Sequence, residues 1–325
     1  MSVVAAVDCG TNAIRLLIVK RDEENTIHEI TRRMEIVRLG EGVDDTGNFT
    51  PAAIERTQHV LSEYVDTMVE HGVKRVRMVA TSATRDAGNQ EDFFAMARQE
   101  LGRAVPGAQA EVITGQEEAR LSFGGSVADL LGADAPFLVI DLGGGSTEFA
   151  LGEQNAADGA VSRVNGAISL NIGCVRLTER YLHTQPPTTE EIVAARSYVR
   201  EQLDIAFHNL AIDTVRTWVG LAGTFTTIAA LALGLEDYDA VKIHQSRISL
   251  DQLQQVTDDL IAMAPGQRME LGPMHPGRAD VIGGGAIVVQ ELASRLHDEC
   301  GVTEVVVSEH DILDGLVHDL LHRNA

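Results

Sequence analysis

The sequence predicts an α/β protein of two domains, and three observations support that prediction. Short apolar runs typical of strands alternate with longer stretches that have helical periodicity. The chain has 325 residues, which is long for one domain and comfortable for two. A strand, a glycine turn and a second strand occur in that order around Asp8, and the same order returns around Asp141. Interleaved strands and helices are typical of α/β architectures.

The elements can be placed along the chain from these patterns. Thr50 followed by Pro51 predicts an N-cap and a helix that runs to about His71. The repeat places the domain boundary near residue 124. We expect an N-terminal domain of residues 1–124 plus about 304–325 and a C-terminal domain of residues 125–303. One large doubly wound sheet is the alternative. The expected strands cover residues 3–7, 14–19, 76–80, 112–113, 137–140, 149–151, 215–219 and 305–307.

Composition restricts the partners of the protein. It has 26 basic and 48 acidic residues and a net charge of −22, which disfavours nucleic acid or an anionic membrane as a ligand. An anionic substrate would therefore need a metal ion and a few local arginines. No apolar run approaches the roughly 20 residues of a membrane span, and no export signal opens the sequence, so we expect a cytoplasmic protein.

The two glycine turns have the composition of phosphate-binding sites. Glycines let backbone N–H groups approach phosphate oxygens, and a carboxylate at a strand end can hold Mg²⁺. A single such turn could be an ordinary hairpin, but two matched copies favour a functional role. The predicted metal ligands are Asp8, Asp141 and Glu148. The predicted phosphate-binding residues are Gly10, Thr11 and Asn12 in the first turn and Gly143, Gly144, Gly145, Ser146 and Thr147 in the second.

A third glycine turn follows the apolar run that ends at Val219. Gly223 and Thr224 precede the apolar helix of residues 228–233, and free N–H groups at a helix N-terminus form an anion site. Ordinary packing between a strand and a helix is the alternative reading of this segment.

Together the three turns resemble the phosphate 1, phosphate 2 and adenosine segments of the actin, Hsp70 and sugar-kinase superfamily. Further segments resemble its exopolyphosphatase and guanosine pentaphosphate phosphohydrolase family over essentially the whole chain. The resemblance implies two actin-like (ribonuclease H-like) domains with an interdomain cleft. The matching segments are residues 8–12, 38–42, 80–87, 113–120, 141–148 and 278–281.

The resemblance also implies an activity. Glu117 and Glu118 are consecutive and would point about 100° apart on a helix, so only one can face a cleft. The general base of the family aligns with Glu118, which leaves Glu117 a capping or supporting role. Arg85 is expected to bind phosphate oxygens, and Mg²⁺ is the expected cofactor, with Mn²⁺ as an alternative. Further candidates for the site are Arg15, Arg38, His244 and Arg278.

The expected reaction is release of terminal orthophosphate from inorganic polyphosphate by a water that Glu118 activates. Hydrolysis of guanosine pentaphosphate is the close alternative, and a sugar-kinase-type phosphotransferase and a non-catalytic actin-like module are more remote ones. The resemblance implies a homodimer. Short polyphosphates are expected to be preferred, because the chain lacks the C-terminal helical domains of long family members and is strongly acidic. Leu313 departs from the family pattern by replacing its usual arginine.

Overall fold

The computed structural model of the protein describes residues 2–128, 130, 133–154 and 162–322, and the chain divides into two units. Unit 1 contains Met1–Leu121 and Ile312–Ala325, and unit 2 contains Ser122–Asp311. Unit 2 extends beyond the expected boundary near residue 304, because the strand Glu304–Val307 pairs with two strands of the second sheet. Two separate sheets exclude the alternative of one large doubly wound sheet.

The sheet of unit 1 has the strand order β3-β2-β1-β4-β5. Strands β1, β2 and β3 pair antiparallel as a meander, whereas β4 lies parallel to β1 and β5 lies parallel to β4. A parallel strand needs a crossover connection, and the helices of unit 1 provide it. The strands are β1 (Ser2–Cys9), β2 (Ala13–Arg21), β3 (Ile27–Ile36), β4 (Arg75–Ala80) and β5 (Ala110–Val112).

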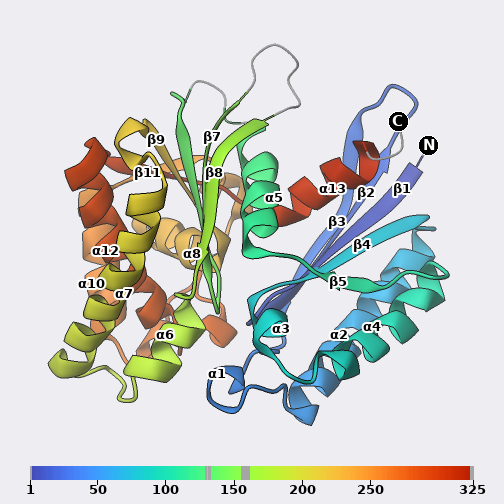
Figure 1. Ribbon diagram of the computed structural model, residues 1–325, viewed down its shortest axis with the longest axis horizontal. Helices are drawn as coiled ribbons and strands as arrows, with labels where there is room; N and C mark the ends of the chain where they lie inside the picture. The colour runs from blue at the N-terminus through green and yellow to red at the C-terminus, as the bar shows by residue number, and fades with distance from the viewer. Residues whose placement is uncertain (1, 129, 131–132, 155–161, 323–325) are drawn as a thin grey trace. The chain divides into compact units, whose positions relative to one another are not determined.

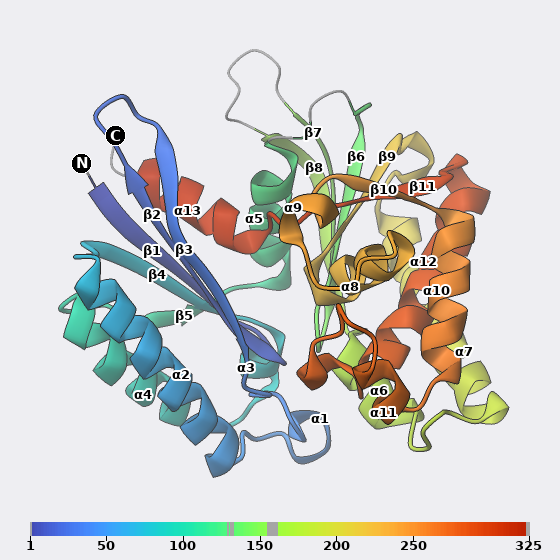
Figure 2. The same cartoon turned by 180° about the vertical axis from the view of Figure 1, so that it is seen from behind.

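Helices cover both faces of this sheet, so the central strand β1 is apolar on both faces from Val3 to Val7. Successive side chains of a strand point to opposite faces, and β1 accordingly directs Val7 toward α2 (Pro51–Glu70) and α4 (Gln90–Ala104). Val4 points the other way, toward α13 (Ile312–His322). Figures 1 and 2 show α2 and α4 side by side along their face of the sheet. Leu313, the residue that replaces an arginine, is buried in the core beneath α13.

The sheet of unit 2 repeats this plan. Its order is β10-β11-β9-β6-β7-β8, with an antiparallel meander of β6, β7 and β8 and parallel neighbours β9 and β11. Strand β10 is an additional antiparallel edge. The topology confirms the duplication that the two glycine turns indicated. The strands are β6 (Phe137–Leu142), β7 (Thr147–Gln154), β8 (Ser162–Leu170), β9 (Thr217–Leu221), β10 (Ser246–Ser249) and β11 (Glu304–Val307).

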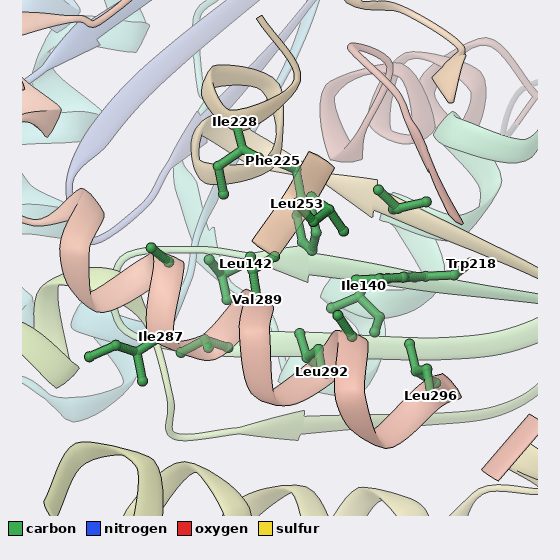
Figure 3. Close-up of a cluster of buried hydrophobic side chains, with 14 of the residues drawn as sticks. Ile140, Leu142, Trp218, Phe225, Ile228, Leu253, Ile287, Val289, Leu292 and Leu296 are labelled. Carbon is green, nitrogen blue, oxygen red and sulfur yellow. The ribbon is translucent and has the colours of Figure 1, made fainter. Parts of the chain in front are cut away.

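The core of unit 2 is packed between its sheet and its long helices. Figure 3 shows Leu292 and Leu296 of α12 (Ile282–Cys300) close to Ile140 of β6 and Trp218 of β9. The Trp218 ring meets Phe225 edge to face, with centroids 5.6 Å apart. Around α12 lie α7 (Thr189–Asn209), α8 (Ala222–Ala232) and α10 (Leu250–Ala262). This packing fixes the strand ends from which the second glycine turn leaves the sheet.

The predicted start of α2 is confirmed, because Thr50 accepts a hydrogen bond from the Ala53 amide and Pro51 is the first helical residue. None of the helices in the described ranges combines the length and the hydropathy that crossing a membrane requires. The remaining helices are α1 (Val43–Thr46), α3 (Ser82–Asp86), α5 (Gly115–Val127), α6 (Cys174–Tyr181), α9 (Ala240–Ile243) and α11 (Pro265–Met269), with short 3₁₀ turns at Ile212–Thr214 and Pro276–Arg278.

Candidate active site

The first glycine turn joins β1 to β2. The Gly10 amide donates to the Ala13 carbonyl at 2.9 Å, which closes a hairpin with Thr11 and Asn12 at its tip. Asp8 and Arg15 are directly opposite each other in the register of the two strands. Arg15 donates to Oδ2 of Asp8 from Nε at 3.0 Å and from Nη2 at 2.5 Å. The predicted metal ligand Asp8 therefore forms an ion pair with two hydrogen bonds to Arg15, one of the further candidates for the site.

The carbonyl groups at the tip of this turn are bound by the segment that follows β3. The Gly40 amide donates to the Thr11 carbonyl at 2.8 Å, and the amides of Val37 and Arg38 donate to the Asn12 carbonyl at 3.0 and 2.8 Å. No backbone carbonyl in the described chain accepts from the N–H groups of Thr11 or Asn12. With its acceptors occupied and its donors available, the tip of the turn suits an anion.

The second glycine turn, between β6 and β7, has the same construction. The Gly143 amide donates to the Ser146 carbonyl at 3.0 Å, and Asp141 is directly opposite Glu148. The equivalent of the Asp8–Arg15 pair is thus a pair of carboxylates. Both are buried, with 7% of Asp141 and 2% of Glu148 exposed. Two buried carboxylates on neighbouring strands repel each other unless a cation or donors neutralise them.

Two serines donate hydrogen bonds to these carboxylates. Ser122 of α5 donates from Oγ to Oδ2 of Asp141 at 2.8 Å, and Ser169 of β8 donates to Oε1 of Glu148 at 2.7 Å. Each bond orients one carboxylate and leaves the charge of the group intact. No pattern in the sequence pointed to these serines, because a lone serine in a helix or strand is usually only a packing residue.

Helix α6 binds the carbonyl groups of the second turn. Amides at its start donate to Gly143 and Gly144, and Arg176 donates from Nε to the Gly145 carbonyl at 2.7 Å. No backbone carbonyl of the described residues accepts from the N–H groups of Gly144 and Gly145. The approach is close, since a Cβ on Gly173 would lie 2.3 Å from the Gly144 carbonyl oxygen. In both turns, therefore, a second segment binds the carbonyl groups, and N–H groups of the turn remain available for an anion.

Thr147, one of the predicted phosphate-binding residues, has an internal hydrogen-bond partner. It has no exposed surface, and its hydroxyl donates to the Ile172 carbonyl at 2.5 Å. This bond ties the start of β7 to the segment that leads into α6. A role of Thr147 in phosphate binding stays a prediction.

Glu118 lies in the first turn of α5 and forms an ion pair with Arg85. Arg85 Nη1 donates to Oε2 of Glu118 at 2.8 Å and to the Ile113 carbonyl at 3.0 Å. Only 8% of Glu118 is exposed. The structure thus joins two predicted site residues that are 33 positions apart in the chain. Ser122 follows Glu118 by one turn on the same helix.

The third glycine segment differs in detail from the expectation. Gly223 and Thr224 lie within the first turn of α8, and no side chain caps this helix. Arg278 packs against Gly223, since a Cβ there would lie 2.3 Å from the Arg278 guanidinium carbon. His244 accepts a hydrogen bond at Nδ1 from the Glu309 amide, and its ring centroid lies 4.3 Å from that of His310. Gly223, Thr224 and Arg278 are thus neighbours, and the anion-binding role of this segment stays a prediction.

The carboxylate oxygens of the second hairpin are suitable ligands for Mg²⁺. In the described part of the chain, no group of three or more His, Cys, Asp or Glu side chains is arranged to hold a metal ion. Mg²⁺ usually takes only one or two protein carboxylates and completes its shell with water and substrate phosphates. Asp141 and Glu148, facing each other across two strands, match that requirement. The expected third ligand, Asp8, belongs to the other unit and stays a prediction.

The fold and the two hairpins define the class, a two-sheet α/β protein with duplicated glycine turns. The chain belongs to the Ppx/GppA phosphatase family, whose model matches residues 17–320. Exopolyphosphatase 2 of Mycobacterium tuberculosis (strain ATCC 25618 / H37Rv) is 53% identical over 320 residues, which cover 98% of each chain. The family assignment agrees with the resemblance seen in the sequence.

Solved structures agree with this assignment. The crystal structure of an exopolyphosphatase-like protein has a TM-score of 0.91 and 40% identity, covering 99% of this chain and 100% of that one. The Ppx/GppA family member of Aquifex aeolicus has a TM-score of 0.78 and 31% identity, covering 100% and 99%. The similarity extends over both units in each case.

Proposed function

We propose that the protein is a Mg²⁺-dependent exopolyphosphatase that releases terminal orthophosphate from inorganic polyphosphate. The substrate class is supported by the similarity to exopolyphosphatase 2 along nearly the whole chain. The mechanism rests on one observation: Glu118 is a buried carboxylate held by Arg85, one helical turn before the serine that binds Asp141. Helix α5 thus carries the proposed base, Glu118, and through hydrogen bonds it holds the cation Arg85 and the candidate metal ligand Asp141.

Hydrolysis of a phosphoanhydride requires charge neutralisation, a positioned water and a base. Mg²⁺ bound at Asp141 and Glu148 would supply positive charge to the terminal phosphoryl group. The N–H groups of the turns bind phosphate oxygens, and Arg85 adds a forked cation that can contact two of them. Glu118 accepts a proton from water, the water oxygen bonds to the terminal phosphorus, and the bond to the bridging oxygen breaks. Orthophosphate and a chain shorter by one unit are the products.

Replacing the base tests the proposal. Glu118→Gln keeps the shape of the side chain and one acceptor oxygen but cannot accept the proton, so we expect phosphate release to fall at least about 100-fold. Glu100→Gln is a matched control, because Glu100 is also buried on a helix of unit 1 and pairs with an arginine at 2.8 Å. Release by Glu118→Gln at a rate near wild type would refute the assignment of the base.

The substrate is tested by measuring orthophosphate from tripolyphosphate, long polyphosphate, guanosine pentaphosphate and ATP side by side. We expect the highest kcat/KM on a polyphosphate. A higher value on guanosine pentaphosphate would replace the proposal by its close alternative, and transfer to an acceptor hydroxyl would indicate a kinase. The cytoplasmic location and the homodimer also remain predictions, which cell fractionation and sedimentation would test.

A further inference from the structure

Arg77 makes a network of ion pairs that the reaction does not explain. It lies in β4 with only 8% of its side chain exposed, and each side of its guanidinium group faces a different carboxylate. Nε donates to Glu111 of β5 at 2.6 Å, Nη2 to Glu117 of α5 at 2.8 Å and Nη1 to Asp319 of α13 at 2.6 Å. One buried residue therefore links three elements of unit 1.

The geometry of the network suggests that Arg77 does more than stabilise the fold, because its bonds also orient the side chains that accept them. Burial works to lower the pKa of Arg77, but its hydrogen bonds to Glu111 and Glu117 and the charge of Asp319 outweigh burial and raise the pKa overall. The planar fork of arginine gives each bond a fixed direction, which lysine cannot reproduce. Arg77 can therefore hold Glu117 in one orientation.

Glu117 and Glu118 belong to the same helical turn. The Glu117 amide donates to Thr114 Oγ1 at 3.2 Å and the Glu118 amide donates to the Thr114 carbonyl at 2.9 Å, so the turn begins at a defined residue. The two side chains point about 100° apart. Arg77 binds Glu117 and Arg85 binds Glu118, so the turn is held from two directions. Holding a helix at two points around its axis prevents its first turn from rotating.

Helix α13 supports the same arrangement from its own side. It supplies Asp319 to Arg77, and a Cβ on Gly315 would lie 2.1 Å from the Leu121 carbonyl oxygen. The backbones of α13 and α5 therefore touch at Gly315. Helix α13 therefore supports α5, the helix that carries Glu118, in two ways: through the ion pair of Asp319 with Arg77 and through the backbone contact at Gly315.

We propose that Arg77 is a positioning residue that, by binding Glu117, fixes the rotation of the first turn of α5 and thereby aims the Glu118 carboxylate. The inference rests on the proposed role of Glu118 as the base. Glu117 takes part only as the acceptor for Arg77, so its charge is not needed for the reaction. A neutral side chain that accepts the same hydrogen bond should serve almost as well.

The test compares two substitutions of Glu117, since Arg77→Met would remove a buried cation that three carboxylates share and would destabilise the fold. With tripolyphosphate and Mg²⁺, we expect Glu117→Leu to lower kcat about tenfold with KM nearly constant, because misaiming a catalytic group slows the chemical step. Glu117→Gln should stay within about threefold of wild type. Glu63→Leu is the matched control, because Glu63 is another half-exposed glutamate of unit 1 paired with an arginine.

Each outcome decides the inference. A loss with Glu117→Gln as large as with Glu117→Leu would mean that the charge of Glu117 itself is needed, and wild-type kcat in Glu117→Leu would mean that no aiming occurs. Either result overturns the proposal. Glu118→Gln, assayed in parallel, separates the two hypotheses: its full activity would refute the base, whereas its inactivity beside a fully active Glu117→Leu would refute only the role of Arg77.

Discussion

Ser122 and Ser169 show how single side chains prepare the second hairpin. Each donates one hydrogen bond to a buried carboxylate, and neither bears a charge of its own. Partners of this kind hold a metal-binding carboxylate in one orientation, and their loss typically weakens metal binding 10–100-fold. The serines therefore offer a way to test the metal site without removing a proposed ligand.

Ser122→Ala is expected to raise the Mg²⁺ concentration needed for half-maximal activity about tenfold, because Asp141 loses the donor that orients it. The measurement is phosphate release against Mg²⁺ concentration at saturating tripolyphosphate. Ser126→Ala is a matched control, since Ser126 is buried one turn further along the same helix but donates to the Phe123 carbonyl. An equal Mg²⁺ requirement in the two variants would contradict the prediction.

The sequence could predict only part of the site at this scale. Asp141 was evident because it ends an apolar run and precedes three glycines, which is a local signal. Arg85 and Glu118 are 33 residues apart, and only the resemblance to a family placed them together. The bond from Arg15 to Asp8 depends on strand register. The hydroxyl of Thr147 donates to the carbonyl of Ile172, a residue that is distant in the chain, so its partner could not be predicted from the sequence.

At the scale of elements, both glycine turns depend on a second segment that binds their carbonyl groups. Residues 37–40 serve the first turn, and the start of α6 serves the second. The hairpins could be predicted from sequence because each lies within a few residues. Their supporting segments could not be predicted, because the start of α6 is distant in the chain from the turn. Nothing in its sequence indicates which carbonyl groups its amides will bind.

Gly173→Ala should disturb the second turn, because the new Cβ would lie 2.3 Å from the Gly144 carbonyl oxygen, a distance that backbone atoms cannot relieve without moving. We expect KM for tripolyphosphate to rise about tenfold, equivalent to about 1.4 kcal/mol of binding free energy.

Gly102→Ala is the control for Gly173→Ala. Gly102 lies inside α4, and beyond the neighbouring backbone of its own helix no atom of the described residues is within 4 Å of the position that its Cβ would take. Alanine there should leave KM as it is and stabilise the fold by about 0.5–1 kcal/mol. A KM for Gly173→Ala equal to that of the control would show that the turn tolerates displacement of α6.

At the scale of the whole molecule, the dominant property is a net charge of −22. A polyanionic substrate must reach a few cationic and N–H groups against this field, and the repulsion grows with the number of phosphates that approach the protein. The repulsion is long-range and is therefore screened by salt over a Debye length of about 8 Å at physiological ionic strength.

We accordingly expect tripolyphosphate to have a higher kcat/KM than long polyphosphate at equal concentration of chain ends and low salt. Added NaCl, at constant free Mg²⁺, should narrow this difference by lowering KM for the long chains. Steady-state rates at several salt concentrations provide the measurement. A preference for long chains that weakens as salt is added would reverse the sign of the argument and indicate a local attractive path for polyphosphate.

The opposite charges that face Asp8 and Asp141 have a further consequence. The two sheets share one strand plan and their hairpins pair in the same register, yet one copy places Arg15 where the other places Glu148. A single position thus places opposite charges across the first hairpin and two like charges across the second. After the duplication, the two copies could specialise through that one position while their backbones stayed alike.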